Sequence, residues 1–362
     1  MIYRAIGLMS GSSLDGLDIV FTEIQEMGGK WSYEIVHADC YVYPDEWITR
    51  LKNVVSLTAL DYQLLHAEYG HYLGLQVNRF IEEHQLQYKV ALVASHGHTA
   101  FHIPGKKMTA QLGDGAAIAA TVQLPVVSDL RAIDIAFGGQ GAPIVPIGEK
   151  LLLGEYDYFL NIGGIANISG NGLGFDVCAA NRVLNMLAAD AGKEYDDQGK
   201  IAAGGNVNNN LLEKLNALSF YQQDYPKSLA NDFGTGIVYP LIKDAGSNIP
   251  DSLRTCTEHI AVQIKKAISG LMNHKPQAIN NKLLVTGGGT FNTFLIERLK
   301  EQLKELDIEV IVPDKKLVKY KEALIIGLIG VLRWREETNV LSSVTGAIRD
   351  SVGGAMWMGQ EE

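Results

Sequence analysis

The sequence contains little cysteine, no long apolar run and no excess of basic residues. Only Cys40, Cys178 and Cys256 occur among 362 residues. This odd, sparse set favours a reducing compartment over a disulfide framework. The longest apolar run, 323–332, is far shorter than the roughly 18 residues that suggest a membrane span. We therefore expect a cytoplasmic protein that does not cross a membrane.

Charge and composition narrow the function classes further. A net charge of -10 argues against non-specific binding to nucleic acid or to acidic membranes, although backbone N–H groups and Mg²⁺ can still hold an anionic ligand. The N-terminal residues lack a basic region followed by a long apolar stretch, so no signal peptide is expected. A hydrophobic fraction of 47% fits a well-cored protein, and the length favours two domains.

The most informative segment is Gly7–Asp18, with the sequence GLMSGSSLDGLD. The β-rich runs 3–9, 18–24 and 31–43 predict an antiparallel meander, and this segment forms its first turn. Glycine permits close approach of a ligand, and successive N–H groups in such a turn bind anions. Asp15 and Asp18 would repel a polyphosphate unless a cation lies between, which indicates a Mg²⁺–nucleotide. An ordinary hairpin whose Ser and Asp satisfy the turn backbone explains the segment equally well.

The opening pattern recurs later in the chain. Strands are predicted at 158–162 and 165–169 around Gly163-Gly164, and a further strand, 282–286, runs into Gly287-Gly288-Gly289 before a helix. Two halves that each begin with a hairpin around a glycine turn imply a duplicated α/β unit with the ligand in the cleft between them. We place the domains at 1–130 and 131–340, with the C-terminal residues packing back on the first.

Six segments, in the same order, resemble the signature segments of the anhydro-N-acetylmuramic acid kinase family: Gly7–Asp18, Ser95–Thr99, Gln111–Gly115, Gly138–Pro143, Asn161–Asn167 and Thr286–Gly289. The resemblance runs nearly the whole length, through Glu322-Ala323 to Val344–Ala347. It implies an α/β fold of the two-domain actin-like ATPase type, a duplicated ribonuclease H-like fold with an interdomain cleft. This superfamily includes sugar kinases and actin.

The resemblance also implies a reaction. ATP would phosphorylate O6 of 1,6-anhydro-N-acetylmuramic acid while water opens the anhydro bridge at C1, giving N-acetylmuramate 6-phosphate and ADP in peptidoglycan recycling. One carboxylate that activates the water suffices for the sugar, because the phosphoryl group takes the place of a proton on the leaving oxygen. The implied cofactors are ATP and Mg²⁺. The implied partner is a small amino sugar, with no nucleic acid and no membrane, and a homodimer is left open.

Asp176 is the general base that the family pattern implies. It ends the third strand of the second half and should point into the cleft. The alternative, which the residues alone favour, is an N-cap for a helix starting near Ala179. The family usually continues after this Asp with Thr-Gly-Pro-Gly-Asn, whereas this chain has Val177-Cys178-Ala179-Ala180-Asn181. That departure indicates a shifted substrate or a subfamily variant, with Cys178 a small apolar filler.

Three glycine clusters are expected to hold the nucleotide. Many sugar kinases of the superfamily place an Asp two residues before the first turn glycine, where this chain has Met9, so Asp15 or Asp18 should orient the metal instead. For each glycine, a plain turn is the alternative. The first cluster would contact the phosphates and Mg²⁺ and comprises Gly11, Ser12, Ser13, Leu14, Asp15, Gly16, Leu17 and Asp18. The second cluster, Gly163 and Gly164, would contact the β- and γ-phosphates. The third cluster would lie against the adenosine and comprises Gly287, Gly288 and Gly289.

A second set of residues is expected to hold the sugar. Arg131 with Asp134 would bind the lactyl carboxylate and hydroxyls, since a guanidinium matches a carboxylate bidentately; the alternative is a surface ion pair between the two. Asp114 would hold the sugar or cap the following helix. Glu322 would reach the cleft or lie on a solvated helix face. His96 or His98 would donate hydrogen bonds to the sugar.

The histidines leave one competing function. His98 and His102 are four residues apart, which on a helix presents two metal ligands on one face, as in the threonylcarbamoyl-transferring ATPases of this superfamily. Gly97 and Pro104 argue against a helix there, and the family usually has Gln where His98 stands. Three alternative functions stay open. They are a metal-dependent carbamoyl-transferring ATPase, a plain sugar 6-kinase without coupled hydrolysis, and an assembly protein of the actin type. The sugar-family segments disfavour the last of these.

Overall fold

The structure, a computed structural model, describes residues 1–11, 14–224, 227–229, 232–274 and 279–359. The predicted phosphate-binding residues Ser12 and Ser13 lie outside the described residues. The chain forms two compact units, Met1–Gly154 with Tyr320–Glu362, and Glu155–Lys319. The first unit continues beyond the expected boundary at residue 130, because α5 (Pro146–Leu152) packs against β3 (Lys30–Tyr41) and Ile147 joins the core of that unit.

The first unit is built on a six-stranded mixed sheet with the order β13-β7-β4-β1-β2-β3. The antiparallel meander expected at the start of the chain is confirmed, and two later strands run parallel to β1. The last strand pairs antiparallel with β7 at the sheet edge. In chain order the strands are β1 (Ile2–Ser10), β2 (Leu17–Met27), β3, β4 (Leu92–Ser95), β7 (Val126–Ser128) and β13 (Ala355–Trp357).

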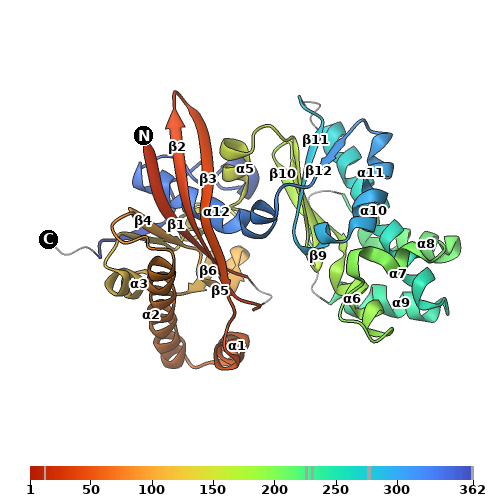
Figure 1. Cartoon of the computed structure of the whole chain (residues 1–362), viewed down its shortest axis with the longest axis horizontal. Helices are drawn as coiled ribbons and strands as arrows, with labels where there is room; N and C mark the ends of the chain where they lie inside the picture. Colours follow the sequence, from red (N-terminus) through yellow and green to blue (C-terminus); the bar gives the residue numbers. More distant parts are fainter. Residues whose placement is uncertain (12–13, 225–226, 230–231, 275–278, 360–362) are drawn as a thin grey trace. The chain divides into compact units, whose positions relative to one another are not determined.

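Helices cover both faces of this sheet. Successive side chains of a strand point to opposite faces, so Ile6 and Leu8 pack into the core with α2 (Ala59–Glu83) and α3 (Gly115–Val122). Ala5 lies in the other core, with α5 and α12 (Lys315–Trp334). A Cβ on Gly7 would overlap the carbonyl oxygen of Ala323, so glycine is what lets α12 lie this close to β1. Figure 1 shows α12 running along the first sheet.

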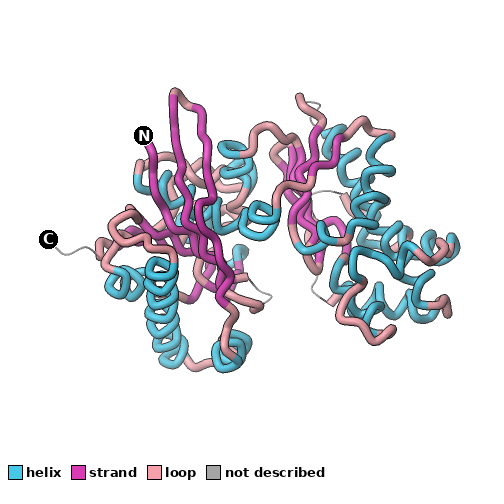
Figure 2. Tube along the Cα trace, viewed as in Figure 1, coloured by secondary structure: helices cyan, strands magenta, loops and turns pink. Residues whose placement is uncertain are grey.

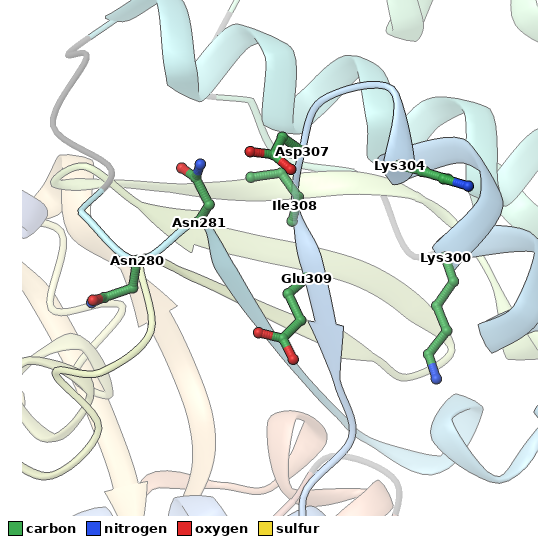
Figure 3. Close-up of a pocket in the computed structure, with 7 residues that line it drawn as sticks. All are labelled: Asn280, Asn281, Lys300, Lys304, Asp307, Ile308 and Glu309. Carbon is green, nitrogen blue, oxygen red and sulfur yellow. The ribbon is translucent and has the colours of Figure 1, made fainter.

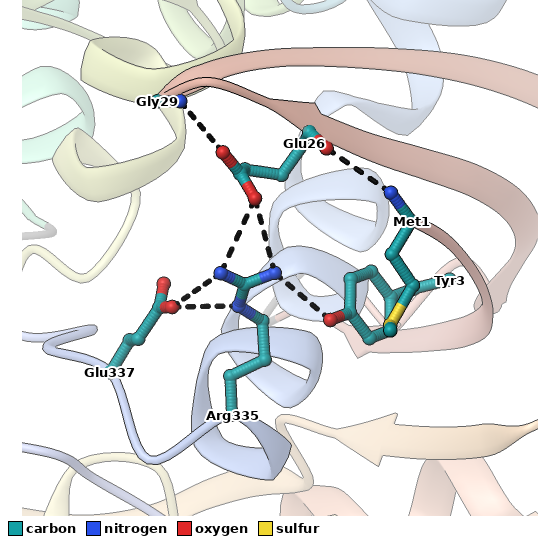
Figure 4. Close-up of polar contacts among 6 residues, drawn as sticks. All are labelled: Met1, Tyr3, Glu26, Gly29, Arg335 and Glu337. Carbon is teal, nitrogen blue, oxygen red and sulfur yellow. Dashed lines mark hydrogen bonds and ion pairs between the residues drawn. The ribbon is translucent and has the colours of Figure 1, made fainter.

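Arg335, just after α12, fastens the end of that helix to the β2–β3 hairpin (Figure 4). Its guanidinium donates to the Tyr3 hydroxyl at 2.9 Å, to Glu337 at 2.7 Å and to Glu26 at 3.5 Å. Glu26 also accepts from the N–H of Gly29 at 2.7 Å, at the tip of the hairpin. The C-terminal part of the chain is thereby integrated into the first unit.

The second unit has a five-stranded sheet with the order β10-β9-β8-β11-β12. β8 (Tyr158–Ile162), β9 (Ile165–Gly170) and β10 (Leu173–Ala179) are antiparallel, and β11 (Lys282–Thr286) and β12 (Glu309–Ile311) run parallel to β8. The first sheet has the same order and directions in β3-β2-β1-β4-β7. This repetition confirms the duplicated α/β unit and the expected α/β class with two mixed sheets, and Figure 2 shows the strands grouped in each unit.

The core of the second unit is closed by helices that pack on its sheet, chiefly α6 (Asn181–Ala189), α10 (Ile249–His274) and α11 (Thr293–Lys304). Among the described residues, no helix is both long enough and apolar enough to cross a membrane. The remaining helices and the small β5–β6 sheet are α1 (Asp45–Lys52), β5 (His98–Ile103), β6 (Met108–Leu112), α4 (Ala132–Ala136), α7 (Lys200–Ala203), α8 (Asn209–Asn216), α9 (Tyr239–Asp244) and α13 (Ser342–Thr345).

Candidate functional site

In the first unit, the predicted phosphate-binding turn joins β1 to β2. Ser10, at the end of β1, belongs to a buried chain of hydrogen-bonded side chains. The Tyr43 hydroxyl donates to Ser10 Oγ at 2.8 Å and lies 2.6 Å from the Tyr69 hydroxyl. Ser10 Oγ lies 3.0 Å from His98 Nδ1. Because Tyr43 donates to Ser10, the Tyr69 hydroxyl donates to Tyr43, and the bond between Ser10 and His98 takes its direction from the tautomer of the ring. Burial lowers the pKa of His98, which favours the neutral ring.

The two acidic residues of this turn lie differently. Asp15 is exposed and Asp18 is partly buried. Asp18 is the register partner of Met9 in the β1–β2 hairpin, and side chains directly opposite in an antiparallel pair have Cβ atoms about 5 Å apart. Asp18 therefore brings a carboxylate beside the position where Met9 replaces the Asp of many sugar kinases. A Cβ on Gly16 would lie 2.5 Å from Cys40 Sγ, so this glycine also serves packing.

Arg131 is the centre of a second group in the first unit. Its Nε and one terminal nitrogen donate to His96 Nε2 at 3.0 and 2.8 Å, and the other terminal nitrogen donates to the Gly141 carbonyl at 2.6 Å. Burial lowers the pKa of Arg131 to about 10, while the negative charge of Glu322 raises it. The guanidinium is therefore charged at neutral pH. Of the predicted sugar-binding residues, the structure thus brings His96 and Arg131 into contact, and Glu322 acts on Arg131 through its charge.

Asp134 has different partners from those predicted. It is fully buried; it accepts from the N–H of Gly141 at 2.7 Å and from the Thr345 hydroxyl at 2.6 Å. The alternative of a surface ion pair between Arg131 and Asp134 is therefore wrong, because Asp134 is buried and the two side chains bond to different backbone groups of Gly141, its N–H and its carbonyl. With both carboxylate oxygens occupied inside the protein, Asp134 holds the glycine loop 138–143 in place.

Hydrogen bonds and burial bear on two further predictions for the first unit, those for Asp114 and Glu322. Asp114 caps α3, accepting from Ala116 N at 2.7 Å and from Ala117 N at 3.3 Å, so the capping role is confirmed. Its contact with sugar stays a prediction. Glu322, on α12, is partly buried rather than on a solvated face.

The histidine pair that would mark a metal site lies on a strand. His98 and His102 both belong to β5, and the exposed His102 hydrogen-bonds to the Thr109 hydroxyl of β6 through Nδ1, at 3.1 Å. The helical spacing that would place both rings on one metal is absent there. Within the described ranges, no group of three or more His, Cys, Asp or Glu side chains is arranged to hold a metal ion.

In the second unit, Asp176 lies within β10 and its side chain is partly buried. The expectation that Asp176 ends this strand is wrong, because β10 continues to Ala179. Its Oδ2 accepts from the N–H of Leu229 at 2.8 Å and from the Ser228 hydroxyl at 3.2 Å, and its own N–H donates to the Lys227 carbonyl. The N-cap of α6 is Ala180, so the alternative role of Asp176 as a helix cap is wrong. The carboxylate is instead held in one orientation by the segment 227–229.

The glycines of the second unit divide into packing and open positions. A Cβ on Gly287 would overlap the Asn161 side chain and one on Gly289 would overlap Ile162, so both let β11 approach β8 closely. Gly163, Gly164 and Gly288 have no such restriction, since the nearest atoms to their added Cβ atoms lie 3.4, 3.6 and 3.7 Å away. These three positions carry no packing reason for glycine.

Gly288 and Gly289 line a pocket of about 370 Å³ in the second unit. Its walls include the side of α6, the segment 195–198 and the turn before α11, with Tyr195 and Phe291 substantially exposed. Aromatic and amide side chains around a glycine-lined wall suit a planar, polar base. The lining residues are Asn181, Leu184, Asn185, Tyr195, Asp196, Asp197, Gln198, Gly288, Gly289, Phe291 and Asn292.

A second pocket, of about 450 Å³, lies at the opposite ends of the same strands (Figure 3). Asn280 and Asn281 precede β11, Glu309 begins β12, and Lys300 and Lys304 come from α11. The pocket carries charges of both signs and contains none of the residues predicted to hold nucleotide or sugar.

A model of the anhydro-N-acetylmuramic acid kinase family matches residues 3–359 of the chain. The chain belongs to this family. It is 32% identical over 368 residues to the anhydro-N-acetylmuramic acid kinase of Francisella tularensis subsp. novicida, covering 94% of this chain and 95% of that one. It is 33% identical over 328 residues to that of Photobacterium profundum, covering 85% and 86%. The predicted family and kinase class are confirmed.

A solved structure of a ROK family glucokinase from Streptomyces griseus in complex with glucose and AMPPNP is also similar. It has a TM-score of 0.41 at 12% identity and covers 90% of this chain and 98% of that chain. This likeness is too distant to carry an argument.

The residues after Asp176 that depart from the usual family sequence pack in the core of the second unit of this kinase. Val177, Cys178, Ala179 and Ala180 are all buried, and β10 has a register irregularity between Asp176 and Cys178. Burial raises the pKa of the Cys178 thiol, which agrees with a packing role rather than a nucleophile.

Sequence reasoning missed three groups that act on the predicted residues. Ser228 and Leu229 hold Asp176, and no periodicity or glycine cluster marks them. Thr345, which donates to Asp134, lies in the segment Val344–Ala347 that resembles the family, and this was the available signal.

Proposed function

We propose that this kinase phosphorylates O6 of 1,6-anhydro-N-acetylmuramic acid with ATP while water opens the anhydro bridge at C1. The observation that carries the proposal is the geometry of Asp176. One carboxylate oxygen is held by two donors, the Leu229 N–H and the Ser228 hydroxyl, and the side chain, which lies within β10, keeps partial exposure. A fixed, accessible carboxylate is what activation of a water molecule requires.

The proposed step balances without a second acid. The water oxygen bonds to C1 and its proton passes to Asp176. The C1–O6 bond breaks, O6 bonds to the γ-phosphorus, and the bond from that phosphorus to the bridging oxygen breaks to release ADP. The carboxylate then returns the proton to solvent. Alignment of these atoms supplies most of the acceleration, because phosphoryl transfer needs little covalent help from the protein.

The nucleotide would use glycine segments from each unit. In the first unit, the turn from Gly11 to Asp18 would contact the phosphates. In the second unit, Gly163 and Gly164 would contact the β- and γ-phosphates, and the pocket at Gly288 supports binding of the adenosine.

Mg²⁺ fits the donors of the first turn. In proteins it commonly binds one or two carboxylates together with substrate phosphates rather than a cage of side chains. Asp18, beside Met9 in the hairpin, and the exposed Asp15 would hold it. When bound, it neutralises phosphate charge and orients the terminal phosphate.

Arg131 would bind the lactyl carboxylate of the sugar. It is charged and partly buried, and a carboxylate matches the outer edge of a guanidinium bidentately. Metal-dependent carbamoyl transfer is less well supported, since His98 and His102 lie on a strand. Cytoplasmic location and a homodimer stay predictions; sedimentation would test the second.

The test combines isotope and mutation. Reaction with ATP, Mg²⁺ and 1,6-anhydro-N-acetylmuramic acid in ¹⁸O-water should place label at C1 and phosphate at O6. Asp176→Asn should lower kcat by about 10²–10⁴-fold, the usual contribution of a general base. The matched control is Asp244→Asn, an exposed carboxylate at the end of α9, which should leave kcat unchanged. Product without C1 label would indicate a plain kinase, and full turnover by Asp176→Asn would exclude this residue as the base.

A further inference from the structure

Arg131 carries its charge beside acceptors that are all neutral. Three of its N–H groups go to His96 Nε2 and the Gly141 carbonyl. Among the described residues, no carboxylate lies within ion-pair distance, and Glu322 acts on it only through its charge at longer range. A partly buried cation without a counterion is costly unless an anion comes to it. One N–H on each terminal nitrogen remains for that anion.

The tautomer of His96 follows from its contacts. His96 Nδ1 lies 2.9 Å from the Gly97 carbonyl oxygen, which can only accept, so Nδ1 carries the proton. Nε2 then has a lone pair, and both donors of Arg131 point to it. Burial, and after it the charge of Arg131, lower the pKa of His96 to about 3, so the ring is neutral at neutral pH.

Because the acceptor on His96 is neutral, it orients Arg131 without cancelling the positive charge of the guanidinium. A carboxylate at residue 96 would orient the guanidinium equally well but would cancel its charge. A protonated histidine would repel it. The ring of His96 has both nitrogens engaged and is buried, so it has no donor left for sugar and acts through Arg131. The Gly141 carbonyl, which Asp134 fixes through the Gly141 N–H, orients the other side of the guanidinium in the same neutral way.

We propose that His96 is a positioning residue: as a neutral acceptor it orients Arg131 so that the outer edge of the guanidinium, with its full charge, selects sugars that carry a carboxylate. This inference rests on the proposed function and concerns its substrate selectivity. It also corrects the expectation that His96 donates directly to the sugar.

The experiment measures kcat and KM for 1,6-anhydro-N-acetylmuramic acid and for its lactyl amide, which has the same shape without the charge. Hydrogen bonds to charged groups are worth about 1.5–3 kcal/mol, or roughly 10- to 100-fold. Arg131→Gln should therefore raise KM for the acid by about that factor and change KM for the amide little. His96→Asn, which lacks an acceptor at the position of Nε2, should do the same to a smaller extent.

Two variants separate positioning from folding. His96→Gln keeps an acceptor at the reach of Nε2 and should retain most of the preference for the acid. His96→Glu places a carboxylate against Arg131 and should abolish the preference even where the protein folds. The control is His71→Asn, an exposed histidine on α2 that hydrogen-bonds to the Thr121 hydroxyl, and it should keep wild-type selectivity.

The outcomes distinguish the inference from the proposed function. Equal losses on acid and amide for His96→Asn, or unchanged selectivity in His96→Glu, would overturn the role of His96 while leaving the kinase reaction intact. If wild-type protein phosphorylates neither sugar, the proposed function fails first. Selectivity lost in Arg131→Gln and His96→Glu but kept in His96→Gln is the result expected.

Discussion

Replacing Lys321 by methionine should destabilise the first unit far more than replacing both Lys321 and Glu149 by apolar residues. Lys321 Nζ lies 3.0 Å from Glu149 Oε1, and the two side chains are only 8% and 7% exposed. At an effective dielectric constant of about 20, two unit charges at this separation attract by about 5 kcal/mol. Loss of one partner of a buried ion pair typically costs about 3–5 kcal/mol, because the remaining buried charge loses this attraction.

The double variant Lys321→Met, Glu149→Leu should cost much less. Both desolvation penalties disappear with the charges, and replacement of a buried ion pair by apolar residues of similar volume is often neutral. The pair joins α5 to α12, and Glu322 follows Lys321 directly, so the single variant should also disturb the Arg131 site.

Urea unfolding followed by tryptophan fluorescence is the appropriate assay. All four tryptophans, Trp31, Trp47, Trp334 and Trp357, belong to the first unit, so the signal reports that unit alone. The slope of free energy against urea should stay unchanged while the midpoint falls. The control is Arg79→Met, which removes an ion pair whose partners are 59% and 44% exposed and should cost less than about 1 kcal/mol.

Two results would refute this reasoning. A loss below about 1 kcal/mol for Lys321→Met would place the pair in a solvent-like environment. A double variant as unstable as the single one would show that shape, rather than loss of the charge–charge attraction, determines the cost.

Two further predictions concern packing and thiol chemistry. Gly7→Ala places a methyl group into the backbone of α12 at Ala323 and should cost about 3 kcal/mol or more in the same urea assay; Gly105→Ala, with no atom near its added Cβ, should cost less than about 0.5 kcal/mol. A thiol reagent should label the exposed Cys40 and leave Cys178 unlabelled in the folded protein, because burial raises the pKa of the Cys178 thiol. Rapid labelling of Cys178, or equal stability of the two glycine variants, would contradict the packing described.

The fold could be predicted from sequence where its signals are local. Apolar runs that meet a glycine turn identify β1–β2 and β8–β9 without any knowledge of the rest of the chain. The extent of the first unit could not be predicted from local signals. It depends on the packing of α12 against β1, and the two are more than three hundred residues apart in the sequence. Gly7 indicates that another segment approaches β1 closely, but a single glycine in a strand does not identify the helix that it contacts.

The sequence names candidate site residues by type, but it does not predict their hydrogen-bond partners. Arg131 and Asp134 are three residues apart, which suggests a pair, yet each bonds instead to the Gly141 peptide. The acceptor for Arg131 is His96, thirty-five residues earlier, and only the folded chain brings them together. Opposite charges near in sequence predict an ion pair only where the backbone between them lets the side chains meet.

The altered residues after Asp176 show how a site can keep a carboxylate while losing the turn that usually follows it. Cys178 and Ala180 are fully buried, so the Cβ atoms that replace the family's glycines fill the unit's core. The orientation of Asp176 is set instead from the other side, by the Leu229 N–H and the Ser228 hydroxyl. A backbone donor cannot be removed by substitution of its side chain. The proposed base is therefore held by a contact that is less sensitive to sequence change than the turn.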